Sequence, residues 1–467
     1  MNEELKKQIA DWHAADRHKE IINALERIPA AERDYDTIGF LARAYNNINE
    51  YAKAADLLES VREEGEDDAV WNFRMGYSQY YLDNNAEALR CFNKAHALDP
   101  DDEDALYFIR QCNIYMPLAG RVERFWKWFV ENERKLSDMI HAKTQEDADD
   151  FMAFVREGSA LISENMNYNL GGDHEFTFSV EGWPDLFILY PYIISCMPES
   201  LKAKWKFNSF NHGTDQAFGF RMYGADIDTA RIMVRASYDE RIGKFHVSYY
   251  EKSLNALSEN ESGGAMWVIL ENTLGEGVSF KYIDSIEQVT ESEDAMIPLT
   301  ELRKHIKATL EAHGQKFFEN PKEIYSSYRM NPQESDDLRY DVITGSTCLD
   351  SVVADYYSDA TDIFDHINSF GAQAVFIAFQ NPDNTADNDI LNLRYDIEDR
   401  ISDMILEPMN LGQVLGGATG THRSYIDLIV YDFITFVHAV KPLLEQYPQF
   451  EFYLSDFRRN SGLIQLT

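Results

Sequence analysis

Two hydrophobic periodicities divide the chain of 467 residues. Up to residue 162, apolar side chains recur at the spacing of one face of an α-helix. From Tyr168 onward, shorter runs alternate apolar and polar residues, as in Phe176, Phe178 and Val180, which would share one face of a half-buried strand. The pattern predicts a helical N-terminal part followed by a longer part in which helices and strands are mixed.

The elements expected after residue 168 fall into two series, separated by a polar stretch, 317–337, that contains Pro321 and Pro332. The first series has strands at 175–181, from 205, and at 218–223, 230–238, 243–251 and 278–284, with helices at 185–197, 265–274 and 299–313. The second has strands at 340–343, 374–379, 411–415, 425–431, 450–454 and 463–466, with helices at 349–370, 395–406 and 433–447. Both series predict an α+β domain with a mainly antiparallel sheet.

One pattern of small and large apolar residues is written twice between Asp34 and Pro100, at a spacing of 34 residues. The matched pairs are Ala42 with Gly76, Ala54 with Ala88, Leu58 with Phe92, and Val61 with Ala95. Two helices can approach to the short end of the usual axis separation of about 8–10 Å only where the contact positions carry little side chain. The repeat therefore predicts stacked helix pairs. Residues 5–28 look like a degenerate earlier copy, and residues 104–115 supply one more helix.

This pattern resembles the tetratricopeptide repeat, which has the same period. The second copy matches that family's best-defined positions with Gly76, Ala88, Phe92, Ala95 and Pro100, whereas the first copy has Ala42 for the glycine and Leu58 for the aromatic residue. The resemblance covers residues 1–115 and implies a concave face that binds a protein or peptide. The family's ligand-facing positions lie on the first helix of each repeat, which gives as candidates Tyr45, Asn46, Asn72, Arg74, Gln79 and Asn113. Plain solvent exposure of these side chains is the alternative.

A second, weaker duplication lies in the mixed part of the chain. The order helix, short strand, Gly-Gly, strand, helix, strand occurs once around Leu170-Gly171-Gly172 and again around Leu415-Gly416-Gly417. Two related α+β domains are therefore expected. The predicted fold is multidomain, with a helical repeat domain at 1–120, a first α+β domain with leading helices at 121–320, and a second α+β domain at 338–467.

The glycine-rich stretch from Leu415 to Ser424 has the composition of a phosphate-binding loop but lacks that loop's lysine, and a strand follows it in place of a helix. A glycine-rich hairpin is the favoured interpretation. The alternative is a binding loop that presents hydrogen-bond donors to a partner, with the candidates Thr419, Thr421, His422 and Arg423. The hairpin and the following Tyr-Ile-Asp are similar to a segment of small uncharacterised bacterial domains, some of which are found among immunity proteins.

The charge of the chain limits the kinds of partner it can have. Its 80 acidic and 43 basic side chains give a net charge of −37, which argues against binding nucleic acid or an anionic membrane. Residues 1–115 hold 24 acids and 13 bases, and residues 331–467 hold 22 acids and seven bases, so acidity is spread over folded surfaces. A basic protein partner is attractive, and the alternative is that the charge only keeps the protein soluble. The first ten residues lack an apolar signal-peptide core, and a cytoplasmic location is expected.

No pattern of catalytic or metal-binding residues stands out. The four cysteines and the histidines are widely scattered, without Cys-x-x-Cys or His-x-x-x-His spacing. The stretch beginning at Asp383 has Asn388 where a calcium loop needs glycine and Arg394 where it needs glutamate. There is no Gly-x-Ser-x-Gly nucleophile elbow. We expect no cofactor, no metal and no enzymatic activity.

These observations predict a non-enzymatic cytoplasmic adaptor that binds a protein through the repeat groove and the acidic α+β domains. A sharper version is an immunity or inhibitor protein that sequesters a basic toxin, with acidic residues steering the association. The alternatives are an enzyme or small-molecule-binding protein with its site between the two α+β domains, and a mimic of nucleic acid. The sequence gives no indication of oligomeric state.

Overall fold

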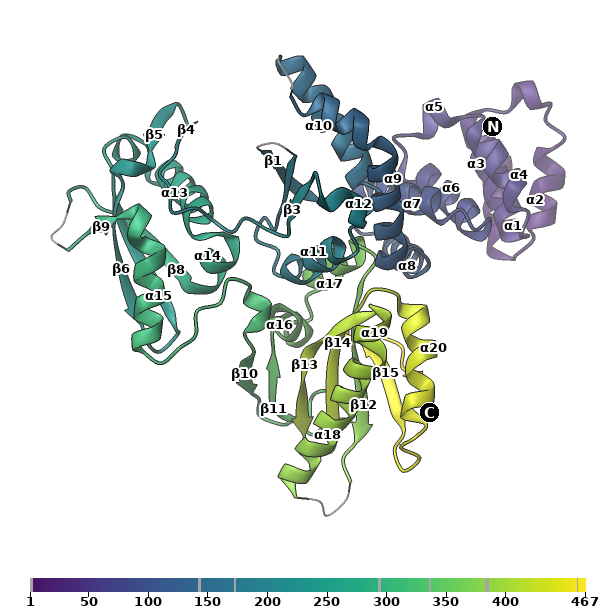
Figure 1. The fold of residues 1–467 in the computed structure, drawn as a ribbon. Coiled ribbons are helices and arrows are strands. Elements are labelled where there is room, and N and C mark those ends of the chain that lie inside the picture. Colours follow the sequence, from purple (N-terminus) through teal and green to yellow (C-terminus); the bar gives the residue numbers. More distant parts are fainter. Residues whose placement is uncertain are drawn as a thin grey trace. The chain divides into compact units, whose positions relative to one another are not determined.

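The computed structural model describes residues 3–141, 144–171, 174–292, 295–335, 337–382, 386–459 and 461–467 (Figure 1). The chain divides into two compact units. The first comprises Met1–Gly120 with the short segments Asn368–Ala372 and Asp432–Ile434, and the second comprises the rest. The predicted order is confirmed at this level, because a helical N-terminal region precedes a region of mostly antiparallel sheets.

The first unit is a succession of antiparallel helix pairs. Its main helices are α1 (Glu3–Ala14), α2 (His18–Leu25), α3 (Tyr35–Asn47), α4 (Tyr51–Glu59), α6 (Ala69–Tyr81), α7 (Asn85–Leu98) and α8 (Glu103–Tyr115). The first helix of each successive pair starts from an aspartate whose carboxylate accepts backbone N–H groups of the first turn: Asp34 for α3, Asp68 for α6 and Asp102 for α8. These capping residues stand 34 positions apart, so the repeat fixes where each helix begins.

The repeated small residues lie where the helices meet. Ala42, Ala54 and Ala88 are fully buried, as is Phe92 on α7. A Cβ atom added to Gly76 on α6 would lie 2.9 Å from the Phe92 ring, so the glycine makes room for the aromatic residue. The prediction that small residues mark helix contacts is confirmed.

The second unit begins at Arg121, within α9 (Leu118–Met139). This helix and α10 (Gln145–Ser159) precede a small sheet of β1 (Asn167–Gly171), β2 (Glu175–Ser179) and β3 (Lys206–Asn208). The aromatic residues of α9 face the core. Phe125, Trp126 and Phe129 are all at most 3% exposed, and the Trp126 Nε1 donates to the Ile193 carbonyl, 2.8 Å away, on α11 (Leu186–Ser195). Helix α9 therefore turns its aromatic side chains into the core.

A second sheet has the order β8-β7-β6-β9, with β6 (Met233–Asp239), β7 (Lys244–Tyr250), β8 (Ile283–Gln288) and β9 (Ile297–Pro298). Beside it lie α13 (Glu259–Leu274), α14 (Glu276–Tyr282), α15 (Leu302–Ala312) and the hairpin of β4 (Gly219–Met222) and β5 (Ala225–Asp228). The strand predicted at 278–284 is wrong. Gly275, at φ +90°, ends α13, and Val278 and Tyr282 then lie one helical turn apart on the buried face of α14. A short apolar run of this kind can form either a helix or a strand, and this one forms a helix.

Glu276, the first residue of α14, ties this sheet region to the smaller one. Its Oε1 accepts hydrogen bonds from the Ser179 hydroxyl (2.6 Å) and the Val180 amide (3.0 Å), and its Oε2 accepts one from the Asn211 amide (2.8 Å). The side chain is 6% exposed, so these donors replace water. Nearby, burial and the charges of Glu276 and Glu181 raise the pKa of Glu271 to about 7.

The Glu271 pKa predicts a pH dependence of stability. Because the folded state holds this proton up to about pH 7 while an ordinary glutamate releases it near 4.5, the contribution of the group to stability falls as pH rises between these values. We expect Glu271→Gln to raise the thermal midpoint relative to wild type at about pH 8 and to change it little at about pH 5. Glu259→Gln, on the exposed first turn of the same helix, is the control. Equal effects of Glu271→Gln at both pH values would contradict this assignment.

The C-terminal sheet has the order β10-β11-β13-β14-β12-β15-β16, and every neighbouring pair is antiparallel (Figure 1). Its strands are β10 (Ser326–Arg329), β11 (Val342–Thr347), β12 (Gln373–Gln380), β13 (Gly412–Gly420), β14 (Arg423–Val430), β15 (Phe452–Asp456) and β16 (Ile464–Gln465). The predicted strands and helices of this part are found, with α18 (Asp387–Ile401) starting earlier than expected and continuing as a π-helical turn, Ser402–Leu406.

The predicted glycine-rich turn is wrong in its position. Gly416 and Gly417 lie inside β13, which continues to Gly420, and Thr421 and His422 make the turn. Gly416, at φ +143°, is required by a close approach, because a Cβ there would lie 2.0 Å from the Ser346 carbonyl oxygen on β11. Of the other predicted glycine pair, Gly171 ends β1 and Gly172 lies outside the described residues.

Helices cover the two faces of this sheet differently. On one face α18 packs over β13 and β14, and Tyr447, just after α20 (Phe433–Leu444), meets Phe452 of β15. On the other face, Tyr356 of α16 (Asp350–Ser358) packs on Phe376 of β12, with α17 (Asp362–Ser369) beside it through Phe364 and Phe457. On this second face, α16 and α17 therefore cover the part of the sheet around Phe376.

A buried ion pair lies at that level. The Arg339 guanidinium and the Asp427 carboxylate of β14 are both 0% exposed and are joined by two hydrogen bonds of 2.6 and 3.1 Å. The guanidinium carbon lies 4.9 Å from the Phe457 ring centroid and 5.1 Å from that of Phe376, so aromatic faces surround the charge. Buried charges of this kind require a partner, because each alone would lose its hydration without compensation.

Breaking the pair should destabilise the sheet strongly. We expect Arg339→Met, which leaves the buried Asp427 carboxylate without its partner, to lower the free energy of opening of β12 and β14 by about 3–5 kcal/mol. The measurement is amide hydrogen exchange, which reports the stability of that sheet separately from the other parts of the chain. The double variant Arg339→Met/Asp427→Leu should be less destabilised than the single one, and exposed Arg329→Met should stay within about 0.5 kcal/mol of wild type. A single variant as stable as wild type would contradict the assigned role.

Candidate functional site

Two places in the structure gather side chains suited to binding, one in each unit. In the helical unit, tyrosines from α4, α6 and α8 form a series of ring contacts, in which Phe108 joins Tyr107 to Tyr80. We call this set the tyrosine surface, and its members are Tyr51, Tyr77, Tyr80, Tyr81, Tyr107 and Tyr115.

The outer members of the tyrosine surface are open to solvent. Tyr81, Tyr107 and Tyr115 are 44%, 55% and 54% exposed. Tyr81 stacks on Tyr51 with ring centroids 4.7 Å apart, and Tyr80 links Tyr81 to Tyr115 through centroid separations of 5.2 and 6.3 Å. Large aromatic side chains that stay exposed in a cluster are typical of protein interaction sites, because a tyrosine gives much contact area with few torsions to fix.

Acidic side chains lie beside these rings. Glu103 and Asp104 are exposed and precede Tyr107 on α8 by four and three residues, so they share its side of the helix. Asp83, two residues after the end of α6, is also exposed. Burial raises the pKa of Tyr80 to about 12, and its hydroxyl therefore stays protonated at neutral pH. The tyrosine surface thus combines neutral aromatic faces with fixed negative charge.

The six groove candidates predicted from the repeat lie deeper than the tyrosine surface. Tyr45, Asn46, Asn72 and Asn113 are buried. Asn46 donates to the Arg74 carbonyl (3.1 Å) and accepts from Ser78 (2.8 Å), and Tyr45 donates to Glu26. Arg74 and Gln79 are half-buried, and burial lowers the Arg74 pKa to about 10. A partner-binding role for this set stays a prediction. Of the six side chains, those of Arg74 and Gln79 are the two that a partner could reach.

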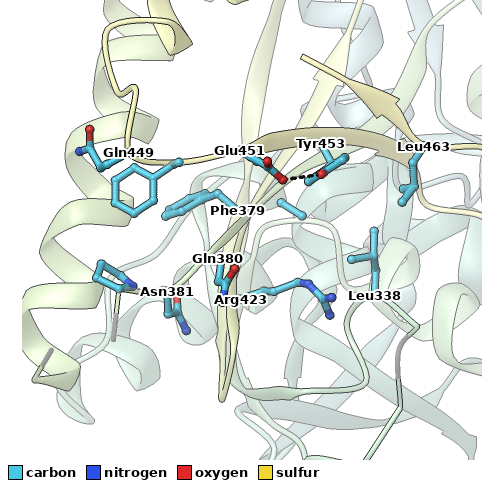
Figure 2. A pocket seen from close by; sticks show the side chains of 12 residues that line it. Leu338, Phe379, Gln380, Asn381, Arg423, Gln449, Glu451, Tyr453 and Leu463 are labelled. Atoms are coloured by element: carbon cyan, nitrogen blue, oxygen red, sulfur yellow. Dashed lines mark hydrogen bonds between the residues drawn. The ribbon is translucent and has the colours of Figure 1, made fainter. Parts of the chain in front are cut away.

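The second place is a cavity of about 800 Å³ on the C-terminal sheet (Figure 2). Its floor comes from three strands in register, with Gln380 opposite Arg423 and Ala378 opposite Tyr453. Because side chains alternate along a strand, these residues share the face of Phe376. They lie beyond Phe376 toward the end of β12, and the cavity opens there. Figure 2 shows the Arg423 side chain extending toward Leu338.

A hydrogen-bond network holds the backbone beneath Arg423. Asp341 is 2% exposed, and its Oδ2 accepts from the amides of His422 (3.0 Å) and Arg423 (2.9 Å). Its Oδ1 accepts from the Tyr425 hydroxyl (2.5 Å), which in turn accepts from the Arg339 amide (2.8 Å). The network therefore connects the buried ion pair to the start of β14.

The four loop candidates are separated by the structure. Arg423 lines the cavity, whereas Thr421 and His422 form the exposed turn. Thr419 is half-buried within β13, and its hydroxyl has no hydrogen-bond partner among the described residues. A joint partner-binding role of the four stays a prediction. Sequence reasoning missed Asp341, Gln380 and Tyr453, since each comes from a different part of the chain and no local motif links them.

A scan of the chain against protein-family models finds no match, and a search of curated proteins finds none either. Within the described ranges, no three His, Cys, Asp or Glu side chains are grouped so as to hold a metal ion. Asp383 and Thr385, which belong to the stretch weighed as a calcium loop, lie outside these ranges. None of the described helices has both the length and the apolar character needed to cross a bilayer.

Removing the Asp341 carboxylate should release the start of β14. We expect Asp341→Ala to speed the amide hydrogen exchange of His422 and Arg423 by about tenfold or more, because each amide loses a charge-assisted hydrogen bond. Asp337→Ala, which removes an exposed carboxylate four residues earlier, should leave these amides unchanged. If both amides exchange in Asp341→Ala as they do in wild type, Asp341 does not hold this segment.

Proposed function

We propose that this protein is a non-enzymatic adaptor whose tetratricopeptide-like helical unit binds a basic segment of another protein. The observation that carries the proposal is the tyrosine surface, a contacting set of partly exposed aromatic rings flanked by acidic side chains. The tetratricopeptide-like character is supported by the capping aspartates Asp34, Asp68 and Asp102 and by the small residues at the helix contacts.

The chemistry of the surface selects the partner. A lysine or arginine side chain gains from lying over a tyrosine face, by about 0.5–1 kcal/mol at an exposed site. The carboxylates of Glu103 and Asp104 attract the same cation, and the net charge of −37 accelerates its approach. An acidic or neutral segment would gain neither the contact of a cation with a tyrosine face nor the attraction to these carboxylates. We therefore infer an arginine- or lysine-rich partner, of which a basic toxin held by an immunity protein is one instance.

The relation between the two α+β regions belongs to the same proposal. Each contains a hairpin followed by a helix and a strand, namely β1, β2, α11 and β3, and then β13, β14, α20 and β15. The strand pairings differ, because β3 pairs with β2 whereas β15 pairs with β12. We propose that these regions are related domains that extend the acidic surface, and that the protein works in the cytoplasm.

The test uses the full-length protein and a library of short random peptides selected for binding to it. We expect the selected peptides to be rich in arginine and lysine and to bind more weakly as salt is raised. The triple variant Tyr81→Ala/Tyr107→Ala/Tyr115→Ala should lower their affinity by about tenfold or more, as expected for the loss of several interface tyrosines. Calorimetry or fluorescence anisotropy provides the measurement.

The matched control is Tyr223→Ala, because Tyr223 is 49% exposed and lies in the second unit. It should bind the selected peptides as wild type does. The proposal fails if the triple variant keeps the wild-type affinity, or if the selected peptides carry no excess of positive charge.

A further inference from the structure

We propose that the cavity on the C-terminal sheet is a binding site for a small organic anion, a molecule with one carboxylate or phosphate group attached to an apolar body, and that Arg423 binds the anionic group. This site is separate from the tyrosine surface and does not depend on the proposed adaptor function.

Arg423 is a basic residue in a strongly acidic part of the chain. Residues 331–467 hold 22 acids and seven bases, and three of these bases pair with carboxylates. Arg339 pairs with Asp427, Arg394 with Glu398, and Arg458 with Asp365. Among the described residues, no carboxylate oxygen lies within 4.0 Å of the Arg423 guanidinium, although Asp341 accepts a hydrogen bond from the Arg423 amide. Its guanidinium has a planar set of donors that matches a carboxylate or phosphate.

The cavity around Arg423 supplies both polar and apolar contacts. Gln380 and Asn381 contribute amide groups at the end of β12, and Figure 2 shows them near the base of the Arg423 side chain. Asn381 is already engaged, since its Nδ2 donates to the Gly420 carbonyl (3.0 Å) and its Oδ1 accepts from Ser424 (2.8 Å). The amide of Gln380 is therefore the one suited to add a hydrogen bond. Apolar walls come from Leu338, Phe450 and Leu463.

The volume and the remaining charge limit the size and the polarity of the ligand. A volume of about 800 Å³ lies within the range of sites for small molecules. Glu451 is the acidic lining side chain, and its Oε2 accepts a hydrogen bond from the Tyr453 hydroxyl, 2.7 Å away. A second negative charge on that side would be repelled. The ligand thus carries its charge at the Arg423 end and an uncharged, apolar remainder along Leu338 and Leu463.

The network beneath the site holds the backbone of Arg423 in place before a ligand binds. Asp341 fixes the Arg423 amide, and Asp341 is itself fixed through Tyr425 to the segment that carries the buried Arg339. Ligand binding then has to order the torsions of the Arg423 side chain but not its backbone, which lowers the entropic cost. The acidity of the surrounding surface does not oppose this, because at ordinary salt concentrations its field is screened over about 8–10 Å.

The experiment measures binding of benzoate and of phenyl phosphate to the full-length protein by ligand-observed NMR and by thermal shift. Benzamide, which has the same ring without the charge, is the matched probe. We expect saturable binding of at least one anion and at least fivefold weaker binding of benzamide. Arg423→Gln should lower the affinity for the anion by about tenfold or more, as expected for a lost charge-assisted hydrogen bond. Arg329→Gln, at an exposed position of β10, should have no effect.

A second variant keeps the test independent of the folding of Arg423→Gln. Leu463 is 53% exposed, so Leu463→Trp should fold normally. The larger side chain should narrow the cavity and lower its affinity for the anion. The proposal is overturned if neither anion binds wild type in the millimolar range, if benzamide binds as tightly as benzoate, or if a folded Arg423→Gln binds the anion as wild type does. Loss of binding in Arg423→Gln and Leu463→Trp together, with Arg329→Gln unchanged, supports it.

Discussion

The buried pair of Arg339 and Asp427 is the constraint on which the C-terminal sheet depends. Two charges withdrawn from water must stay together, so the segment before β11 is fixed against β14 in the middle of the sheet. Helix α16 is fixed to the same segment, because the hydroxyls of Tyr356 and Tyr357 donate to the carbonyls of Leu338 and Arg339, each at 2.7 Å. Arg339 holds a positive φ of +68°, a strained conformation that these contacts and the ion pair compensate.

The same constraint reaches the cavity through one carboxylate. Asp341 lies two residues after Arg339 and receives the amides at the start of β14, so that Arg423 begins its strand in a fixed place. In the helical unit the elements are fixed by different interactions. Its capping aspartates set where each first helix begins, and its small residues set how closely the helices pack. The two units therefore offer opposite chemistry on rigid supports: aromatic rings among carboxylates in one, and a guanidinium among apolar walls in the other.

The sequence predicts the framework better than the sites, for physical reasons that particular residues make clear. The repeat predicts helix contacts because Gly76 and Ala88 are selected by local geometry. It fails at 278–284, where a short apolar run fits helix or strand equally, and at Gly416, where glycine serves a close approach between strands in place of a turn. Arg423 could be singled out from its loop, but its cavity could not, because Gln380 and Tyr453 join it only through strand register. The tyrosine surface escaped prediction because exposure depends on how each helix is rotated against its neighbours.

The most direct test of the central claim, that the helical unit is the binding surface for a basic segment, is to locate a bound peptide on the full-length protein. Amide hydrogen exchange measured with and without a saturating arginine-rich peptide would do this. The account predicts slower exchange in α6 and α8, the helices that carry most of the tyrosine surface, with the C-terminal sheet unchanged. Protection confined to β12, β14 and β15, or none in residues 69–115, would contradict it.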